Sequence, residues 1–328
     1  MNKLSIFENK FNQIFQRAFP NIKIAPFRYG TEEGLNYTHF IIPPQNKNLQ
    51  GSNYFTNKRH GYYHFTSIDA LISIISTKVF RSYNLNHLKD PREFLYAGNL
   101  IPLDSKFIDD ARENFFILSL CENIHDILPA EKFNIWRLYG RDGNGCIIKI
   151  AFIENDPVDW HNFYLSNVHY GITARSHINQ ISELLRDINK DNKYLGIDLG
   201  QIMCFHKSSL YRSEKEVRLL YDKREKKGLS HTSHYNSDNQ LTFPIIRTEI
   251  SDSFNSKIKY LEIPIINFNN VPTEEHIPVI KISQVILGYR LKNQFEEIKS
   301  ELEILFKQKL GYCPSVTLSR LSKTFWGY

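Results

Sequence analysis

The apolar residues of this chain follow helix-like spacing in some segments and strand-like spacing in others. Residues 3–18 have the spacing of an amphipathic helix that ends before Pro20, with apolar positions at Leu4, Ile6, Phe7, Phe11, Ile14, Phe15 and Ala18. Short strands are expected over residues 21–28 and 37–42, followed by a polar, asparagine-rich connection. We therefore interpret residues 1–55 as an N-terminal extension that packs on a main body, residues 56–328.

The main body is predicted to begin with a strand, a helix and a second strand. Aromatic and β-branched residues favour a strand over residues 61–66. Ser67 is placed to cap the helix that follows, with Asp69 in its first turn. The second strand is expected over residues 79–83.

Strands and helices follow one another irregularly along the rest of the chain. Further strands are predicted over residues 115–120, 146–153, 214–222, 241–246, 259–265, 282–289 and 315–321. Helices are predicted from about residue 104 and over 133–140, 176–190 and 291–309, while residues 200–213 form either a helix or an irregular segment. This mixture predicts an α+β fold with a mixed or antiparallel sheet and flanking helices. No strand is followed by a glycine-rich Rossmann or P-loop motif, so neither nucleotide site is expected.

Composition places the chain among globular proteins, with 41% hydrophobic and 23% charged residues. The net charge of +6 fits either a solvated surface with excess lysine or a face that attracts phosphate groups or nucleic acid. The cysteines lie far apart among apolar residues, which indicates buried hydrophobes rather than disulfides or zinc ligands; they are Cys121, Cys146, Cys204 and Cys313.

The sequence predicts a protein of the reducing cytoplasm with no membrane partner. No stretch approaches 18 apolar residues, and the first residues lack the apolar run of a signal peptide. The pair His231 and His234 has no acidic or cysteine neighbour at ligand spacing, so no metal site is expected. Patterns for a serine or cysteine nucleophile are absent as well.

The sharpest polar pattern lies on the strand predicted over residues 214–222. Because alternate side chains of a strand share a face, Glu214, Glu216 and Arg218 would project together. Such charges are costly when buried without partners, and they are tolerated in a wet cleft or as an ion pair. The pattern therefore indicates either a functional cleft or an ion-pair ladder on an edge strand.

Other candidate residues lie at the ends of the first strands. His64 and Thr66 share one face of the first strand, where the alternative is a histidine satisfied by a backbone carbonyl. Arg81 could hold a phosphate group through its two guanidinium nitrogens, beside Ser82. Asp90 is expected to cap a helix that starts with Pro91.

Trp136 and Tyr139 lie three residues apart on one predicted helix face. Together with Ser119 they form a third candidate group. The two aromatic side chains would either stack on an aromatic ligand or belong to the core.

The order of these motifs resembles a bacterial family, the domain-of-unknown-function family twenty-nine seventy-one. The resemblance covers roughly residues 60–325 and rests on the motifs YHFTS, VFRSYNLNHLKDPREF, FFILSLCE, WRLYG and FHKSSLYRSEKEVRLLYD. The chain has Lys89 where the family usually has Asn, and Tyr211 where it usually has Trp.

That family is in turn similar in pattern to the ADP-ribosyltransferase fold. The resemblance implies an NAD cleft lined by His64 with Thr66, by Arg81 or Ser82, and by Glu216 as the catalytic carboxylate. Glu214 would orient or deprotonate the acceptor, while Arg81 or Arg218 would hold the pyrophosphate. Tyr139 is expected among the NAD-binding residues.

Two functional hypotheses follow. The first is an NAD-dependent ADP-ribosyltransferase or NAD glycohydrolase, of the kind found among bacterial toxins and antiviral defence proteins, acting on a protein or nucleic-acid acceptor. The second is a non-catalytic nucleotide- or nucleic-acid-binding module on the same fold. Glu216 and His64 facing one cleft would favour the enzyme, whereas Glu216 locked to Arg218 on an exposed sheet face would favour the second hypothesis.

Overall fold

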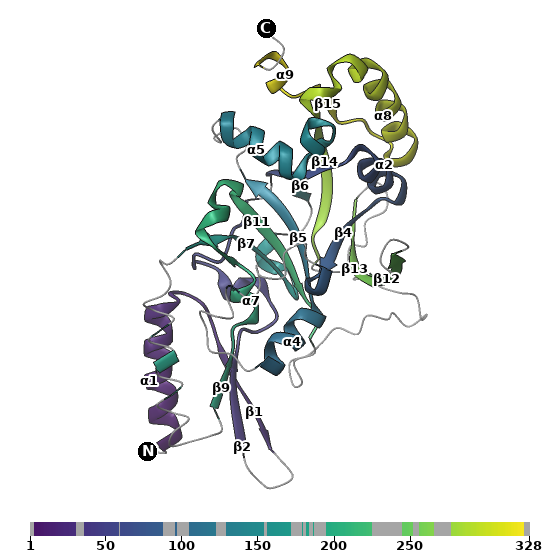
Figure 1. Cartoon of the computed structure of the whole chain (residues 1–328). Helices are drawn as coiled ribbons and strands as arrows, with labels where there is room; N and C mark the ends of the chain where they lie inside the picture. The colour runs from purple at the N-terminus through teal and green to yellow at the C-terminus, as the bar shows by residue number, and fades with distance from the viewer. Residues whose placement is uncertain are drawn as a thin grey trace, which may run out of the picture.

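The computed structural model describes residues 3–30, 36–58, 60–87, 96, 105–122, 129–153, 156–171, 179, 182–183, 186, 195–224, 245–251, 256–265 and 277–324. The expected cap at Asp90, the pair His231 and His234 and nearly all of the helix expected over 176–190 lie outside these residues. Figure 1 shows the helices placed around a long twisted sheet.

The helices of the described chain are α1 (Lys3–Ala18), α2 (Ile68–Thr77), α4 (Ser105–Asn114), α5 (Pro129–Tyr139), α7 (Gly200–Met203), α8 (Phe295–Leu310) and α9 (Leu321–Thr324). A short 3-10 helix, η7 (Ser209–Glu214), precedes the strand that carries Glu216. No helix among the described residues is both long and apolar enough to cross a membrane.

The strands are β1 (Ala25–Gly30), β2 (Asn36–Ile41), β3 (His60–Thr66), β4 (Val79–Asn84), β5 (Phe115–Glu122), β6 (Cys146–Ile153), β7 (Phe163–Asn167), β8 (His169–Tyr170), β9 (Leu195–Asp198), β10 (His206–Lys207), β11 (Glu216–Asp222), β12 (Ile245–Ser251), β13 (Ser256–Pro264), β14 (Val279–Leu287) and β15 (Ser315–Leu318). The fold is α+β with a mixed, mostly antiparallel sheet and flanking helices, as the sequence predicted.

Local sequence signals account for much of this order. The predicted cap at Ser67 is confirmed, since its hydroxyl accepts a hydrogen bond from the Ala70 amide at 3.1 Å and α2 begins at the next residue. The helix predicted over 3–18 is α1. Residues 200–213 are neither one helix nor fully irregular, because they hold α7, β10 and most of η7.

The main sheet divides at β5. On one edge, β5 pairs with the end of β4 at Phe116 and Ile117 and with β3 at Cys121 and Glu122. On its other edge, β5 pairs along its whole length with antiparallel β11, which pairs in turn with β7. Between its two partial neighbours the first edge of β5 is open, and Ser119 is the exposed residue at its centre. This opening places polar groups next to an otherwise buried strand.

The N-terminal residues pack through an aromatic cluster. β1 and β2 form a small sheet with β9, which comes from much later in the chain. Phe11 and Phe15 of α1 belong to a buried cluster that also contains Tyr164 and Leu220 of the main sheet. A larger core lies on the side of the sheet covered by α2 and α8 (Figure 1). The apolar face of α1 is thus buried against the main body.

Candidate functional site

Four charged side chains meet at the start of β11, where most of their surface is buried. The Lys207 ammonium lies 2.7 Å from Glu214 Oε2 and 2.9 Å from Glu216 Oε2. The Arg218 guanidinium donates to both oxygens of Glu216, at 2.8 Å from Nε and 3.1 Å from Nη2. Two positive and two negative groups therefore satisfy one another in a site closed to most solvent. We call these four residues the charge cluster.

Arg218 is the anchor of the charge cluster. Its residue surface is only 2% exposed, and its third polar contact is a 2.6 Å hydrogen bond from Nη1 to the Cys204 carbonyl. Glu216 and Arg218 lie two apart on β11 and share a face, as the alternation predicted. The sequence also offered an exposed ion-pair ladder, but both side chains are buried.

Glu214 joins the charge cluster by a different route from the one expected. It was predicted to lie on the strand with Glu216, but it ends η7, and Lys215 follows it in the left-handed conformation with φ 45° and ψ 47°. That backbone turn breaks the strand alternation. Glu214 nevertheless lies close to Glu216, because the Lys207 ammonium of β10 contacts both carboxylates. The Tyr139 hydroxyl also donates a hydrogen bond to Glu214 Oε1.

The two carboxylates have pKa values displaced in opposite directions. Burial acts to raise the pKa of Glu216, but Arg218 and Lys207 outweigh it and lower the pKa to about 2. Burial raises the pKa of Glu214 above its usual value, and Lys207 and Tyr139 only partly oppose this. One group is therefore permanently ionised while its neighbour is the better proton acceptor.

His64 lies where β3 separates from β5. Its ring Nδ1 donates to the Ser119 carbonyl at 3.1 Å, and burial lowers its pKa, which keeps the ring neutral. Tyr63 is paired with Cys121, and Cys121 with Glu216, so strand alternation puts His64 and Glu216 on opposite faces of the sheet. The side chains of His64 and Glu216, which the resemblance implied to line one cleft, therefore do not project from the same face of the sheet.

Ser119 nevertheless connects the two residues. The Ser119 carbonyl accepts a hydrogen bond from His64. The Ser119 hydroxyl makes a hydrogen bond that helps to lower the pKa of Glu216. Two arrangements were considered from the sequence: Glu216 and His64 facing one cleft, or Glu216 paired with Arg218 on an exposed sheet face. The structure matches neither of them completely. Glu216 is locked to Arg218 but in a buried position, and His64 reaches the same opening from the other face.

The remaining residues that were predicted to line the NAD cleft are Arg81, Ser82 and Thr66. Arg81 donates to both oxygens of Glu249 at 2.8 Å and stacks on the Tyr260 ring at 4.3 Å, so its guanidinium is engaged away from Glu216. Ser82 is buried, and its hydroxyl has no hydrogen-bond partner among the described residues. Thr66 ends β3, where it pairs with Cys146.

The predicted aromatic pair divides between core and site. Trp136 is buried in a small cluster and meets Phe65 edge to face. Tyr139, on the same helix α5, is exposed and reaches Glu214. The core alternative therefore holds for Trp136 and not for Tyr139.

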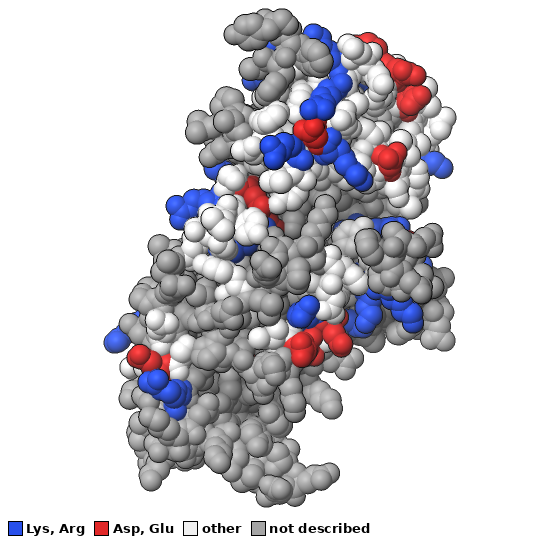
Figure 2. Space-filling view, in the orientation of Figure 1, with Lys and Arg blue, Asp and Glu red and all other residues white. Residues whose placement is uncertain are grey.

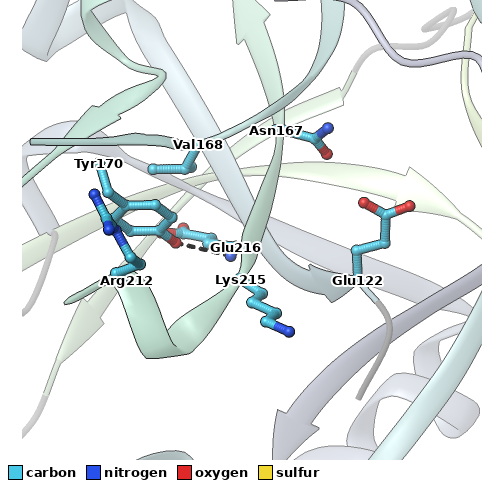
Figure 3. Close-up of a pocket in the computed structure, with 7 residues that line it drawn as sticks. All are labelled: Glu122, Asn167, Val168, Tyr170, Arg212, Lys215 and Glu216. Atoms are coloured by element: carbon cyan, nitrogen blue, oxygen red, sulfur yellow. Dashed lines mark hydrogen bonds between the residues drawn. The ribbon is translucent and has the colours of Figure 1, made fainter. Parts of the chain in front are cut away.

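A pocket of about 310 Å³ opens beside the charge cluster. Figure 3 shows Arg212 and Tyr170 on one side, Glu122 and Asn167 on the other, and Lys215 between them. The Tyr170 hydroxyl accepts the Glu216 amide at 2.8 Å, which attaches the pocket wall to β11. Tyr170 and Asn167 were missed because β7 and β8 are too short to give a periodic signal.

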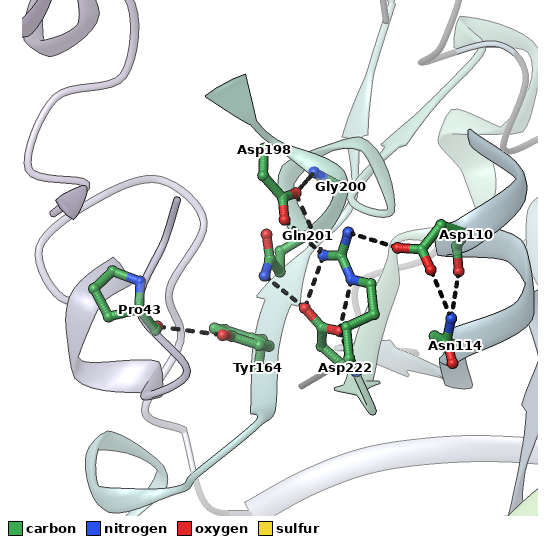
Figure 4. A network of polar contacts seen from close by, with 9 residues as sticks. Pro43, Asp110, Asn114, Tyr164, Asp198, Gly200, Gln201 and Asp222 are labelled. Atoms are coloured by element: carbon green, nitrogen blue, oxygen red, sulfur yellow. Dashed lines mark hydrogen bonds and ion pairs between the residues drawn. The ribbon is translucent and has the colours of Figure 1, made fainter. Parts of the chain in front are cut away.

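A second polar network stabilises the other end of β11 (Figure 4). Arg224 pairs with Asp222 at 2.9 Å and with Asp198 at 3.1 Å, and its guanidinium stacks on the Phe115 ring at 4.3 Å. Gln201 of α7 donates to Asp222 at 2.7 Å. These contacts connect β9 and α7 to the main sheet, and we assign the network a structural role.

Two histidines, the buried His206 and the half-buried His169, lie between the N-terminal segment and the charge cluster. His206, next to Lys207 on β10, lies 2.9 Å from the Tyr54 hydroxyl through Nε2, and its ring centre is 5.6 Å from that of His169. Burial, His169 and Arg218 lower the pKa of His206 to about 3, and burial also lowers that of His169. Both rings are therefore neutral in the folded protein.

We expect these histidines to make the protein acid-sensitive. The unfolded chain binds protons at histidine below about pH 6.5, while the folded chain leaves His206 unprotonated down to about pH 3. The free energy of unfolding should therefore be highest at pH values well above 6.5, and it should decrease as pH falls from about 6.5 towards 3. His206 alone should account for a loss of about 2 kcal/mol at pH 5. Urea unfolding at pH 7.5 and 5.0 measures this loss.

The variant His206→Gln separates this effect from general acid denaturation. Gln keeps a polar group near Tyr54 but does not titrate, so the difference in stability between the two pH values should shrink by about 2 kcal/mol. An unchanged difference would show that other groups cause the loss. Protonation of Glu216 is a smaller concern, because its contribution is lost only as pH falls from about 4.5 towards 2.

No protein-family model, curated protein or solved structure matches the chain. The family resemblance drawn from the motifs of residues 60–325 therefore stays a prediction.

Proposed function

We propose that this protein binds NAD and cleaves its bond between nicotinamide and ribose, as an ADP-ribosyltransferase or an NAD glycohydrolase. The observation that carries the proposal is the pair of carboxylates, Glu214 and Glu216, that share the Lys207 ammonium and have pKa values displaced in opposite directions, with Glu216 at the wall of a pocket. Paired groups whose environments separate their pKa values are typical of sites that divide electrostatic and acid–base roles.

The chemistry follows from these charge states. As the C–N bond breaks, nicotinamide leaves with the bonding electrons and the ribose carbon becomes cationic. The ionised Glu216 carboxylate stabilises that cation, which exists mainly in the transition state. Glu214 accepts the proton of the attacking water or acceptor hydroxyl as the new bond to ribose forms.

The opening along β5 supports the same assignment. His64 and Ser82, whose hydroxyl has no hydrogen-bond partner among the described residues, lie on the strands that flank it. The neutral His64 ring can position a ribose hydroxyl or carboxamide. The resemblance implied that Arg81 or Arg218 binds the pyrophosphate. We do not propose this role for them, because both guanidinium groups are paired with glutamates.

The proposal is tested by incubating the full-length chain with NAD and measuring the nicotinamide released, beside the variant Glu216→Gln. We expect release by the wild-type protein and a large loss in the variant, together with a higher melting temperature of both proteins in NAD. The absence of both release and NAD-dependent stabilisation in the wild-type protein would contradict the proposal.

A second candidate function is non-catalytic nucleotide binding on the same site. It is favoured by the engagement of both Glu216 oxygens by Arg218 and Lys207, which leaves less of the carboxylate for a ribose. On the face shown in Figure 2, the acidic and basic side chains of the described residues are interspersed. NAD-dependent stabilisation without release of nicotinamide would favour this second function.

A further inference from the structure

We propose that the pocket beside Glu216 is a phosphate-binding subsite in which Arg212 and Lys215 hold a phosphate group of a nucleotide. The inference deepens the proposed function, on which it rests for the reaction at Glu216. The family resemblance implied that Arg81 or Arg218 holds the phosphates, but both guanidinium groups are paired with glutamates.

The balance of charges around the pocket favours an anion. Its two carboxylates are already compensated, since Glu122 pairs with Lys58 at 2.9 Å and Glu216 pairs with two cations of the charge cluster. Arg212 and Lys215 line the same pocket, and neither has a carboxylate partner within the described part of the chain. Among the described residues, the pocket therefore has two positive charges without a paired carboxylate, and an anionic ligand would neutralise them.

Neutral donors complete the subsite. The Tyr170 oxygen accepts the Glu216 amide, so its own proton is free to be donated into the pocket. Burial and the nearby Glu216 raise the pKa of Tyr170, which keeps that proton in place. The Asn167 side chain lines the opposite wall and adds amide donors. A volume of about 310 Å³ is sufficient for a phosphate together with the sugar to which it is attached.

The backbone of Lys215 directs its side chain to this position. Lys215 has a positive φ of 45°, a left-handed conformation that is unfavourable for most residues other than glycine. This residue separates η7 from β11, so the side chains of Lys215 and Glu216 lie in different environments. Glu216 enters the charge cluster while Lys215 remains exposed at the pocket.

This conformation also provides a matched test. Asn tolerates the left-handed region well, so Lys215→Asn removes the ammonium group without adding backbone strain. Lys78 is a second exposed lysine in the same conformation, with φ 60° at the end of α2, and it does not line the pocket. Lys78→Asn is therefore the control for charge and backbone, and Arg212→Gln is the second test variant.

Binding is measured by isothermal titration calorimetry with inorganic pyrophosphate and with ADP, using adenosine as the probe that lacks phosphate. We expect both phosphate compounds to bind more weakly at higher salt, since the cations are exposed. Lys215→Asn and Arg212→Gln should each weaken binding about tenfold or more, the loss of one charge-assisted hydrogen bond. Lys78→Asn should bind as the wild-type protein does, and adenosine should show no dependence on either test variant.

Competition with NAD identifies the source of the phosphate. Displacement of pyrophosphate by NAD would assign the subsite to the phosphates of the dinucleotide itself, and simultaneous binding would assign it to a phosphate of the second substrate. Either result supports the subsite. Failure of pyrophosphate and ADP to bind, or equal binding by the wild-type protein and both test variants, would overturn it. Because only binding is measured, these outcomes are independent of whether nicotinamide is released.

Discussion

Glu216→Gln should lower the rate of nicotinamide release by about 10³-fold, or about 4 kcal/mol of transition-state stabilisation. Gln has the size of Glu and can still accept a hydrogen bond from Arg218, but it carries no charge to stabilise the cationic ribose. The Michaelis constant for NAD should change little, because the lost interaction develops mainly in the transition state. Initial rates at several NAD concentrations separate the two parameters.

Two further variants show whether the loss reflects catalysis or folding. Glu216→Asp keeps the charge of the cluster but withdraws the carboxylate from the ribose, so a folded protein with low activity is expected. Glu214→Gln should impair transfer to an acceptor by about 10²-fold or more and leave NAD binding intact, as expected for a general base. Full activity in Glu216→Asp and Glu216→Gln would remove Glu216 from the mechanism.

The pH dependence of the rate should follow Glu214 rather than Glu216. Burial raises the pKa of Glu214, and a base works only when ionised, so the rate should fall as pH decreases towards that raised pKa. Glu216 remains ionised well below this range. The acid limb of the rate profile should therefore disappear in Glu214→Gln, when it is compared with the wild-type protein at pH values where both proteins remain folded.

The parts of the site that the sequence predicted are those set by local chemistry. Strand alternation placed Glu216 and Arg218 on one face, and the hydroxyl of Ser67 marked the start of α2. Both signals involve neighbours within three residues, where backbone geometry leaves few possibilities.

The parts that were missed depend on pairing between distant segments. Lys207 reaches Glu214 and Glu216 because β10 pairs in parallel with β8, and each of these strands has only two residues. The turn at Lys215 has no sequence marker, since lysine is not a residue that favours a positive φ. Strand alternation therefore extended the predicted strand through Glu214, although the left-handed residue Lys215 separates Glu214 from β11.

The way in which β3 and β11 pair with β5 also cannot be predicted from local sequence patterns. The family resemblance implied that His64 and Glu216 line one cleft. Their actual faces are set by the register of β3 and β11 against β5. A shift of one residue in either register would exchange the faces, and no local signal fixes it.

Arg218→Met should lower the free energy of unfolding by about 3–5 kcal/mol, the usual cost of removing one partner from a buried ion pair. The side chain is 2% exposed, and its loss leaves the Glu216 carboxylate with Lys207 as its remaining cation. The Cys204 carbonyl also loses its hydrogen bond from Arg218. Urea denaturation followed by circular dichroism measures the change.

The same substitution at Arg81 provides the control, because it breaks another two-oxygen contact with a glutamate. The side chains of Arg81 and Glu249 are 30% and 49% exposed, so solvent screens the pair and the expected loss is below about 1 kcal/mol. The double variant Arg218→Met with Glu216→Gln should regain a substantial part of the lost stability, since Lys207 and Glu214 then remain as a neutral pair. A double variant as unstable as Arg218→Met would show that packing around the arginine stem, rather than an unpaired charge, determines the loss. In that case the charge cluster would be better explained by its role at the pocket than by its contribution to folding.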